Sequence, residues 1–378
     1  MGGIIKNAKK LIARSLTNTV GPILNEKIIV LESDDWGSIR MSSKEAFNNL
    51  LNKNYPVDKC PYNTNDALES NDDLMQLFEV LNSIRGGDNK PAIITANNIV
   101  SNPNFEKIKE SDYKKYYNEP FTETLKRYPN HDKVMDLYKS GISEGLILPQ
   151  FHGREHLNVK RWMNALENFE KHEIDAFNNK VFSPKMIKSK GYTNEYMDAL
   201  DFDDKSEIED QKLYLREGLE SFEEIWGFKS ESFIAPCYIW HSKLEETLRE
   251  YGVKYIQGLI NQFEPLDKQE YKYKKIYHYQ GQKNKLGQRY FIRNAFFEPS
   301  TNPDFDWIGD CLNRISIAFK LKKPAIVSVH RLNFMGHLNP KNREVNLKLF
   351  KELLTKITKQ WPDVQFLSTD KLGHFYDK

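Results

Sequence analysis

Cysteine is scarce in this chain of 378 residues, which contains only Cys60, Cys237 and Cys311. Their number is odd, their spacing is wide, and no CxxC pair occurs. This argues against a disulfide framework and against a cysteine zinc site. So few cysteines are typical of a reducing compartment, and we predict a cytoplasmic protein.

Long apolar runs are also missing, because no stretch reaches the about 18 residues that a membrane span needs. The N-terminus is interrupted by Lys9, Lys10 and Arg14, so it has no signal-peptide core. Its apolar residues recur at helical spacing, and we predict an amphipathic basic helix within residues 1–26. Such a helix packs on its own domain or, through residues 4–16, lies on an anionic membrane surface.

The net charge is only +2, and there is no basic patch interleaved with aromatic residues. This argues against a nucleic-acid polymer as a partner. The hydrophobic content of 39% and the charged content of 29% are those of a soluble globular protein. The aromatic content of 12% suits a sugar-binding cleft and an ordinary core equally.

Apolar, β-rich runs alternate with helical patterns along the rest of the chain. The predicted strands are 27–31, 91–96, 146–151, 232–235, 253–257, 290–292, 325–329 and 364–367. Strands that alternate with helices indicate a parallel sheet, and about eight such units indicate an α/β barrel. We therefore predict a barrel domain over 27–378, with insertions at about 99–130 and 157–210 near the rim where barrels hold their active sites.

Two adjacent aspartates end the first predicted strand, in "IVLESDDWGSIR". Neighbouring carboxylates repel each other, and each raises the pKa of the other. A cation beside Asp34 and Asp35 would offset this repulsion. The pair therefore indicates a metal site.

Two histidines follow the predicted strand 146–151, in "LILPQFHGREHLN". If a helical turn begins at His152, the spacing of four residues places His156 on the same face, within reach of one metal ion. The same letters match H-x-x-E-H, the inverted zinc-peptidase signature. That alternative needs a long helix, which Pro149 and Gly153 disfavour.

A catalytic zinc ion usually takes three protein ligands and keeps one position for water. His152, His156 and one of the two aspartates supply three ligands, which leaves the other aspartate free to take a proton from the water. Spacing alone does not decide which aspartate has which role.

These motifs resemble those of polysaccharide deacetylases of the carbohydrate esterase family 4 type. "ESDDWG" resembles the T-F-D-D-G motif with Trp36 inserted, and "HGREH" resembles H-[ST]-x-x-H with Gly153 in place of the hydroxyl residue. "SFIAPCYIW", "PAIVSVHRL" and "VQFLSTDKL" follow in the family's order. The resemblance implies a distorted (β/α)7 barrel.

The resemblance also implies roles. Asp34 would be the general base, and Asp35, with His152 and His156, would hold one divalent metal ion, with zinc expected. His330 would be the general acid. The backbone N–H of Cys237, which follows Pro236, would hold the oxyanion.

Several positions depart from the family pattern. Ile234 stands where the family has an arginine that pairs with the base, and Arg331 or Arg154 are the candidate substitutes. The family's Asp-Trp pair could be Asp306-Trp307, or Asp306 could be a helix N-cap. The expected sugar contacts, each with core packing or turn formation as its alternative, are Trp36, Pro236, Cys237, Trp240, Arg331 and Asn333.

The expected function is removal of N-acetyl, or O-acetyl, groups from a glycan or from a nucleotide- or lipid-linked amino-sugar precursor. The alternatives are a metal amidase that acts on a non-sugar amide and a catalytically silent glycan-binding barrel, which the altered third motif allows.

Overall fold

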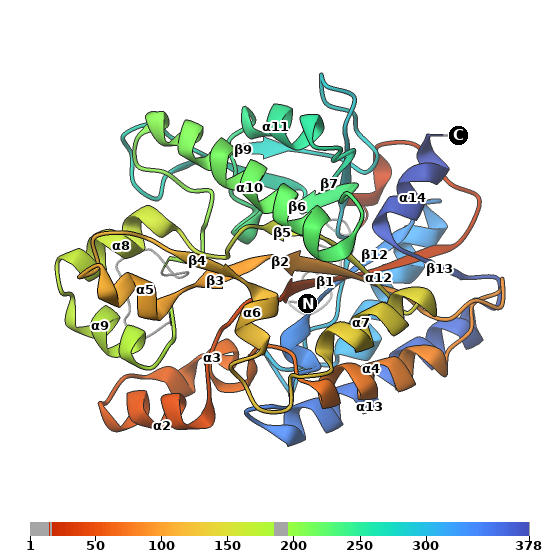
Figure 1. Ribbon diagram of the computed structural model, residues 1–378. Helices are drawn as coiled ribbons and strands as arrows, with labels where there is room; N and C mark the ends of the chain where they lie inside the picture. Colours follow the sequence, from red (N-terminus) through yellow and green to blue (C-terminus); the bar gives the residue numbers. More distant parts are fainter. Residues whose placement is uncertain (1–14, 16, 185–195, 378) are drawn as a thin grey trace, which may run out of the picture.

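Strand β1 (Ile28–Trp36) lies at the centre of a parallel sheet in the computed structural model, which describes residues 15, 17–184 and 196–377 (Figure 1). The hydrogen-bonded strands follow the order β10-β7-β6-β5-β2-β1-β12-β11, with β13 paired to the start of β1. The other strands of this sheet are β2 (Ile94–Ile99), β5 (Ile147–Gly153), β6 (Ser232–Ile234), β7 (Tyr255–Gly258), β10 (Arg289–Ile292), β11 (Ala295–Phe296), β12 (Ala325–His330) and β13 (Gln365–Leu367).

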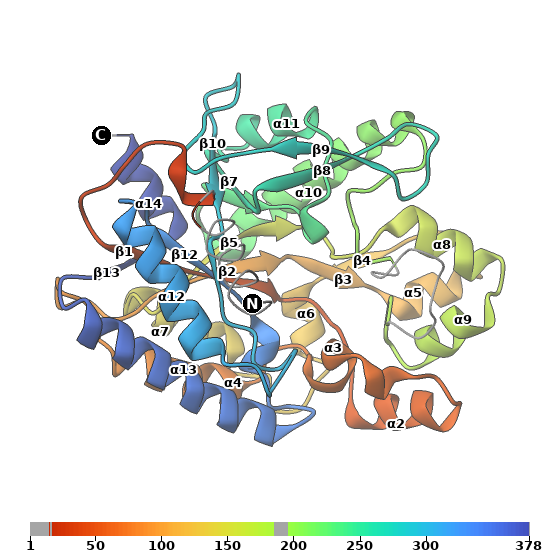
Figure 2. The ribbon, with the colours of Figure 1, turned by 180° about the vertical axis from the view of Figure 1, so that it is seen from behind.

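One bent segment closes this sheet into a barrel. Its first half, β10, pairs with β7, and its second half, β11, pairs with β12. At the bend between them, Arg293 N–H donates to Gly258 O and Asn294 N–H donates to Ile326 O. The two edges of the sheet are therefore one continuous piece of chain, and the predicted distorted seven-membered barrel is confirmed. Figure 2 shows this segment from behind.

Each predicted strand is present, because near-continuous apolar runs suit strands that are buried on both faces. The helices that cover the barrel have the expected one-sided apolar pattern. In α4, residues Leu74, Leu77, Phe78 and Leu81 are buried. The helix begins at a capping box in which Ser70 and Asp73 bond reciprocally.

The helices surround the barrel: in Figure 1, α4, α7 and α13 lie below the strands, and α10 and α11 lie above them. The helices are α2 (Lys44–Asn52), α3 (Pro61–Asn65), α4 (Asn71–Asn82), α5 (Phe105–Glu110), α6 (Phe121–Leu125), α7 (Val134–Ser143), α8 (Val159–Glu167), α9 (Lys171–Asn178), α10 (Ile208–Trp226), α11 (Leu244–Glu250), α12 (Trp307–Lys320), α13 (Pro340–Gln360) and α14 (Thr369–Tyr376).

The two predicted insertions pack against each other. The first contains the hairpin of β3 (Ser101–Pro103) and β4 (Asn118–Pro120), and the second contains α8 and α9. Phe105 of the first and Trp162 of the second belong to one apolar cluster, with their rings 6.3 Å apart. A further hairpin, β8 (Asn261–Pro265) with β9 (Tyr273–Tyr277), was not predicted from the sequence.

The predicted N-terminal helix falls mostly outside the described residues, as does the membrane contact proposed for residues 4–16, of which only Ser15 is described. Asn18 accepts a hydrogen bond from Asn294, and Leu24 N–H donates to Lys322 O, so the following segment is attached to the barrel. Among the described residues, no helix is both long enough and apolar enough to cross a membrane.

Candidate active site

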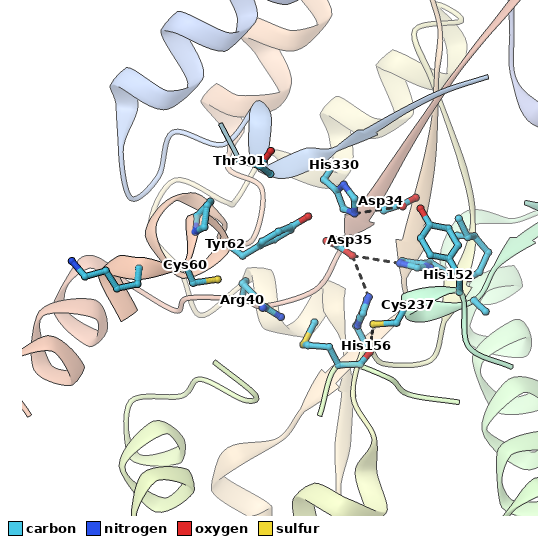
Figure 3. A pocket seen from close by; sticks show the side chains of 16 residues that line it. Asp34, Asp35, Arg40, Cys60, Tyr62, His152, His156, Cys237, Thr301 and His330 are labelled. Atoms are coloured by element: carbon cyan, nitrogen blue, oxygen red, sulfur yellow. Dashed lines mark hydrogen bonds and ion pairs between the residues drawn. The ribbon is translucent and has the colours of Figure 1, made fainter. Parts of the chain in front are cut away.

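A bulge at the end of β1 turns both aspartates toward one cavity. Neighbouring side chains of a regular strand point to opposite faces, but the register of β1 against β2 shifts between Ser33 and Trp36. Asp35 has a φ of 76°, in the left-handed region that non-glycine residues rarely adopt. Asp34 and Asp35 consequently both line the cavity drawn in Figure 3.

The histidine pair also depends on a bend, and not on the helical turn that we predicted. His152 belongs to β5 itself, and Gly153, with a φ of 132°, redirects the chain. The rings of His152 and His156 then lie 5.1 Å apart. Because no helix carries this segment, and because Glu155 is bound by the Arg154 guanidinium, the inverted zinc-peptidase interpretation is wrong.

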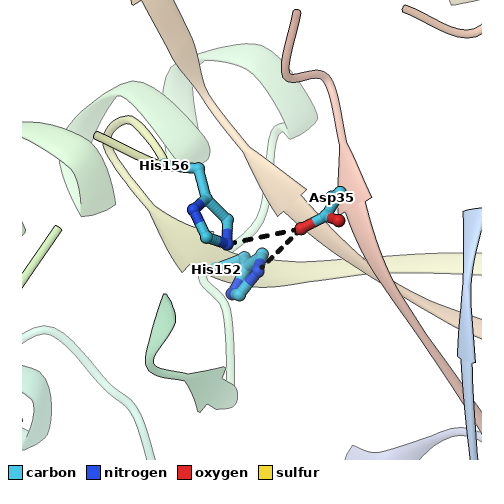
Figure 4. A group of neighbouring side chains, drawn as sticks. All are labelled: Asp35, His152 and His156. Carbon is cyan, nitrogen blue, oxygen red and sulfur yellow. Dashed lines mark ion pairs between the residues drawn. The ribbon is translucent and has the colours of Figure 1, made fainter. Parts of the chain in front are cut away.

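Asp35, His152 and His156 form a cluster whose three ligand atoms lie within 4.8 Å of one another (Figure 4). Nε2 of each histidine lies 3.4 Å from the same Asp35 oxygen, Oδ1. Ligand bonds of about 2.0 to 2.2 Å around a tetrahedral zinc ion place neighbouring ligand atoms about 3.3 to 3.6 Å apart. The spacing of the cluster therefore fits such an ion.

The protonation of His152 supports the same conclusion. Its Nδ1 lies 2.9 Å from Ile234 O, which only accepts, so Nδ1 carries a proton, and in the neutral imidazole Nε2 presents a lone pair toward the cluster. This buried Nε2 has no hydrogen-bond partner among the described residues, and it faces a carboxylate oxygen. A cation between this nitrogen and the carboxylate oxygen would satisfy both atoms.

The electrostatics keep the cluster in its ligand form at neutral pH. Burial lowers the pKa of His156 to about 4, so its imidazole is neutral. Burial alone would raise the pKa of Asp35, but the neighbouring His152 and His156 hold it well below its ordinary value. Two imidazoles and one carboxylate are the donor set of many zinc sites.

Arg293 is the arginine that holds Asp34. Its Nη1 donates to Asp34 Oδ2 and its Nη2 to Oδ1, both at 2.6 Å, while its Nε donates to Glu32 at 2.7 Å. Asn97 also donates to Asp34 Oδ1, at 2.7 Å. Burial would raise the pKa of Asp34, but the Arg293 guanidinium outweighs this and lowers it to about 2.

Both arginines that we expected as substitutes for Ile234 lie elsewhere. Arg331 is fully buried and binds Asp66 and Glu69, so the expectation that it contacts substrate is wrong. Arg154 binds Glu155 and Glu217. Neither side chain donates to Asp34.

His330, at the end of β12, is oriented by Glu298. Nδ1 of His330 donates to Glu298 Oε1 at 2.7 Å, and its Nε2 lies 3.8 Å from Asp34 Oδ2. Burial would lower the pKa of His330, but the Glu298 carboxylate, with Asp35 and Asp34 beyond it, raises it to about 10. The imidazole is therefore protonated at neutral pH.

Asp306 and Trp307, which we considered as the Asp-Trp pair of the family, do not orient His330, whose Nδ1 is bound by Glu298. Asp306 is exposed and accepts from Gly309 N–H as the N-cap of α12, which was our alternative. Asn333 was expected to contact sugar, but it is fully buried and donates to Glu298 Oε2 at 2.8 Å. It therefore supports the partner of His330.

The segment after β6 forms another wall of the cavity. Cys237 and Tyr238 both line it, with left-handed φ values of 56° and 59°. Two consecutive non-glycine residues in this region store backbone strain, as is common at functional sites. The Tyr238 hydroxyl accepts from Arg293 at 3.1 Å. Pro236 is buried behind this wall and is not among the lining residues.

The two tryptophans expected as sugar contacts belong to the core. Trp36 is fully buried, and its Nε1 donates to Ser33 at 2.9 Å. Trp240 is 2% exposed, stacks on His278 and donates to Glu245. Neither ring lines the cavity, which has a volume of about 550 Å³.

Sequence reasoning missed Arg293 and Glu298, and also the lining residues Arg40 and Tyr62. The available signal was the end of the strand at 290–292, where "FIRNAFFEP" places an arginine and a glutamate directly after apolar residues. Polar side chains at strand ends are candidates for a barrel's active site.

No family model matches the sequence, and no curated protein matches it. Among solved structures, the fold is similar to 4-α-glucanotransferase from Thermococcus litoralis, at 10% identity and a TM-score of 0.46 over 92% of this chain but only 40% of that one. A Mycobacterium smegmatis protein assigned as a polysaccharide deacetylase matches at 10% identity and a TM-score of 0.43, over 95% of this chain and 93% of that one. The allantoinase PuuE matches at 9% identity and a TM-score of 0.43, over 94% and 93% of the two chains. Similarities at this level do not assign a function, which depends on the side chains of the site.

Proposed function

We propose that the protein is a metal-dependent hydrolase that removes N-acetyl, or O-acetyl, groups from a glycan or glycan precursor. One observation carries the proposal: a buried aspartate held by an arginine, a histidine held by a glutamate and a cluster of three possible metal ligands all line one cavity. Amide hydrolysis requires a proton acceptor for water, a proton donor for the amine and a stabilised oxyanion.

Asp35, His152 and His156 would hold one divalent ion, with zinc expected from the two imidazoles and the carboxylate. A zinc ion bound there lowers the pKa of a coordinated water to about 7 and polarises the carbonyl of the substrate. Asp34 remains ionised because of Arg293, so it is available to accept a proton.

Asp34 would receive the proton of the attacking water, and His330 would give its Nε2 proton to the leaving amine nitrogen. The two groups face each other across 3.8 Å, between Asp34 Oδ2 and His330 Nε2. Glu298 stabilises the protonated form of His330, which suits the proton donor. The backbone N–H of Cys237 would hold the oxyanion, as proposed from the sequence.

The proposed substrate is an acetamido sugar, either within a glycan or linked to a nucleotide or lipid. The function is tested by measuring acetate release from such compounds with three preparations. These are zinc-loaded protein, protein treated with a chelator and chelated protein to which zinc has been restored. Release that stops on chelation and returns with zinc supports it. Zinc-loaded protein that releases no acetate from any acetylated sugar contradicts it, and turnover of non-sugar amides alone favours the metal amidase.

A further inference from the structure

The cavity contains a wall that the chemistry described above does not use. Besides the histidines, four charged residues line it: Asp34, Asp35, Arg40 and Lys59. Asp34 is bound by Arg293, and Asp35 faces the two ligand histidines. The other two charged residues of the lining, Arg40 and Lys59, are both positive. Figure 3 shows Arg40 beside Tyr62, on the opposite side of the cavity from Cys237.

The charge of Arg40 acts on the nearby Asp66, but that carboxylate is bound by Arg331, and Arg40 forms no ion pair within the described residues. It makes no salt bridge and donates no hydrogen bond there, and its buried Nε has no partner. Its guanidinium carbon lies over the face of Tyr62, 5.5 Å from the ring centroid. By contrast, the fully buried Arg293 and Arg331 each bind two carboxylates. A guanidinium that is left unpaired at a cavity wall is suited to a planar or tetrahedral anion.

The position of Arg40 relates it to the proposed reaction. The Tyr62 ring lies next to both groups, because its centroid is 5.5 Å from the Arg40 guanidinium carbon and 5.6 Å from the centre of the His330 imidazole, on which it packs edge-on. An anionic group on Arg40 and an acetamide at His330 would thus both lie beside this one aromatic ring. Lys59 adds a positive charge at the same wall, although it is exposed and shares its charge with Asp58.

We propose that the substrate carries a carboxylate or phosphoryl group and that the Arg40 guanidinium binds it, so that Arg40 selects anionic acetamido sugars over neutral ones. This inference rests on the proposed deacetylase function and narrows its substrate class. The shared chemistry is an oxyanion that accepts two hydrogen bonds from the guanidinium fork. A phosphate ester and a uronic acid both provide it.

Three test substrates show whether Arg40 binds a phosphate or a carboxylate. They are a neutral N-acetylhexosamine, its phosphate monoester and its uronic acid. For wild-type protein loaded with zinc, kcat/KM should be about 10- to 100-fold higher for at least one anionic compound than for the neutral one. R40Q should reduce that ratio at least about tenfold, mainly through KM, and R40K should keep part of it because the charge remains. The matched control is R216Q, which removes an exposed arginine on α10 and leaves the ratio unchanged.

Equal kcat/KM values for the neutral and anionic compounds in the wild type, or an unchanged ratio in R40Q, would overturn the inference. Because Arg40 donates no hydrogen bond within the described residues, R40Q should fold, and its thermal unfolding checks this.

Calorimetric titration of the zinc-loaded protein with the phosphate monoester and the uronic acid separates this inference from the proposed function. Arg40-dependent binding of either compound without acetate release would retain the anion site and contradict the deacetylase. Turnover without any preference for an anion would retain the deacetylase and contradict the anion site. Binding that R40Q leaves unchanged would also contradict the anion site.

Discussion

Arg293 holds Asp34 by two parallel hydrogen bonds, from Nη1 to Oδ2 and from Nη2 to Oδ1, each 2.6 Å long. The two residues are far apart in the sequence and meet because the bent β10–β11 segment closes the barrel beside β12, the neighbour of β1. The closure of the fold and the orientation of the proposed base therefore depend on the same piece of chain.

Replacement of Arg293 by lysine should lower kcat about tenfold or more while zinc content is retained. Lysine keeps the positive charge but cannot form the two-pronged contact, so Asp34 is no longer fixed. Replacement by glutamine should lower kcat and also destabilise the fold. Asp34 and Glu32 then lose their buried counter-ion, which should reduce the unfolding free energy by about 3–5 kcal/mol. Steady-state kinetics and chemical denaturation measure the two effects.

R331K is the matched control for this prediction, since Arg331 is as deeply buried but binds Asp66 and Glu69. It should lower stability with a smaller effect on kcat. A kcat loss in R331K as large as that in R293K would contradict a specific role for Arg293.

Replacement of Glu298 by glutamine should shift the alkaline limb of the kcat–pH profile to lower pH by about one unit or more. His330 is protonated below its pKa, so activity that needs its proton falls as the pH rises through that pKa. The Glu298 carboxylate raises this pKa, and its removal lowers it. A bound cation lowers the pKa of His330 in the wild type and in E298Q alike. The informative quantity is therefore the difference in the alkaline limb between the two proteins.

The control for the pH profile is E245Q, which removes another buried carboxylate, one that accepts from Trp240 and Tyr290 away from the cavity. Its alkaline limb should match that of the wild type. An unshifted limb in E298Q would show that His330 is not the proton donor.

Zinc should raise the unfolding temperature of the wild type. A ligand that binds only the folded state stabilises it by about 2.7 kcal/mol when its free concentration is about a hundred times its Kd. His152→Ala and His156→Ala should lose this increase because each removes one ligand of the cluster. The partly buried His172 lies beside Glu170 and Glu173, and His172→Ala should retain it. An equal rise in all four proteins would place the bound zinc elsewhere.

The sequence was sufficient for the barrel because its strands are apolar runs with helical patterns between them, and periodicity is a local property. The histidine pair was also predictable, since it lies at the end of an apolar strand. The role of Arg293 was not, because it depends on which strands the 289–296 segment joins. Pairing between distant segments leaves little trace in a single sequence.

Trp36 illustrates a second limit. An aromatic ring directly after two site aspartates suggested a contact with sugar, but the bulge in β1 changes the face on which each residue falls. One irregular residue is enough to move a side chain from the cavity into the core. Local composition does not reveal this shift.

The most direct test of the account is the acetate-release rate of Asp34→Asn, measured on protein whose zinc content is known. Asp34 is assigned to the proton and Asp35 to the metal, although the two carboxylates are neighbours. We predict that Asp34→Asn keeps about one zinc per chain and loses about 10²-fold or more in kcat, with no recovery on added zinc. Asp35→Asn, measured in parallel, should instead bind zinc weakly and regain some activity in excess zinc. Wild-type turnover by Asp34→Asn, or its failure to retain zinc, would contradict the account.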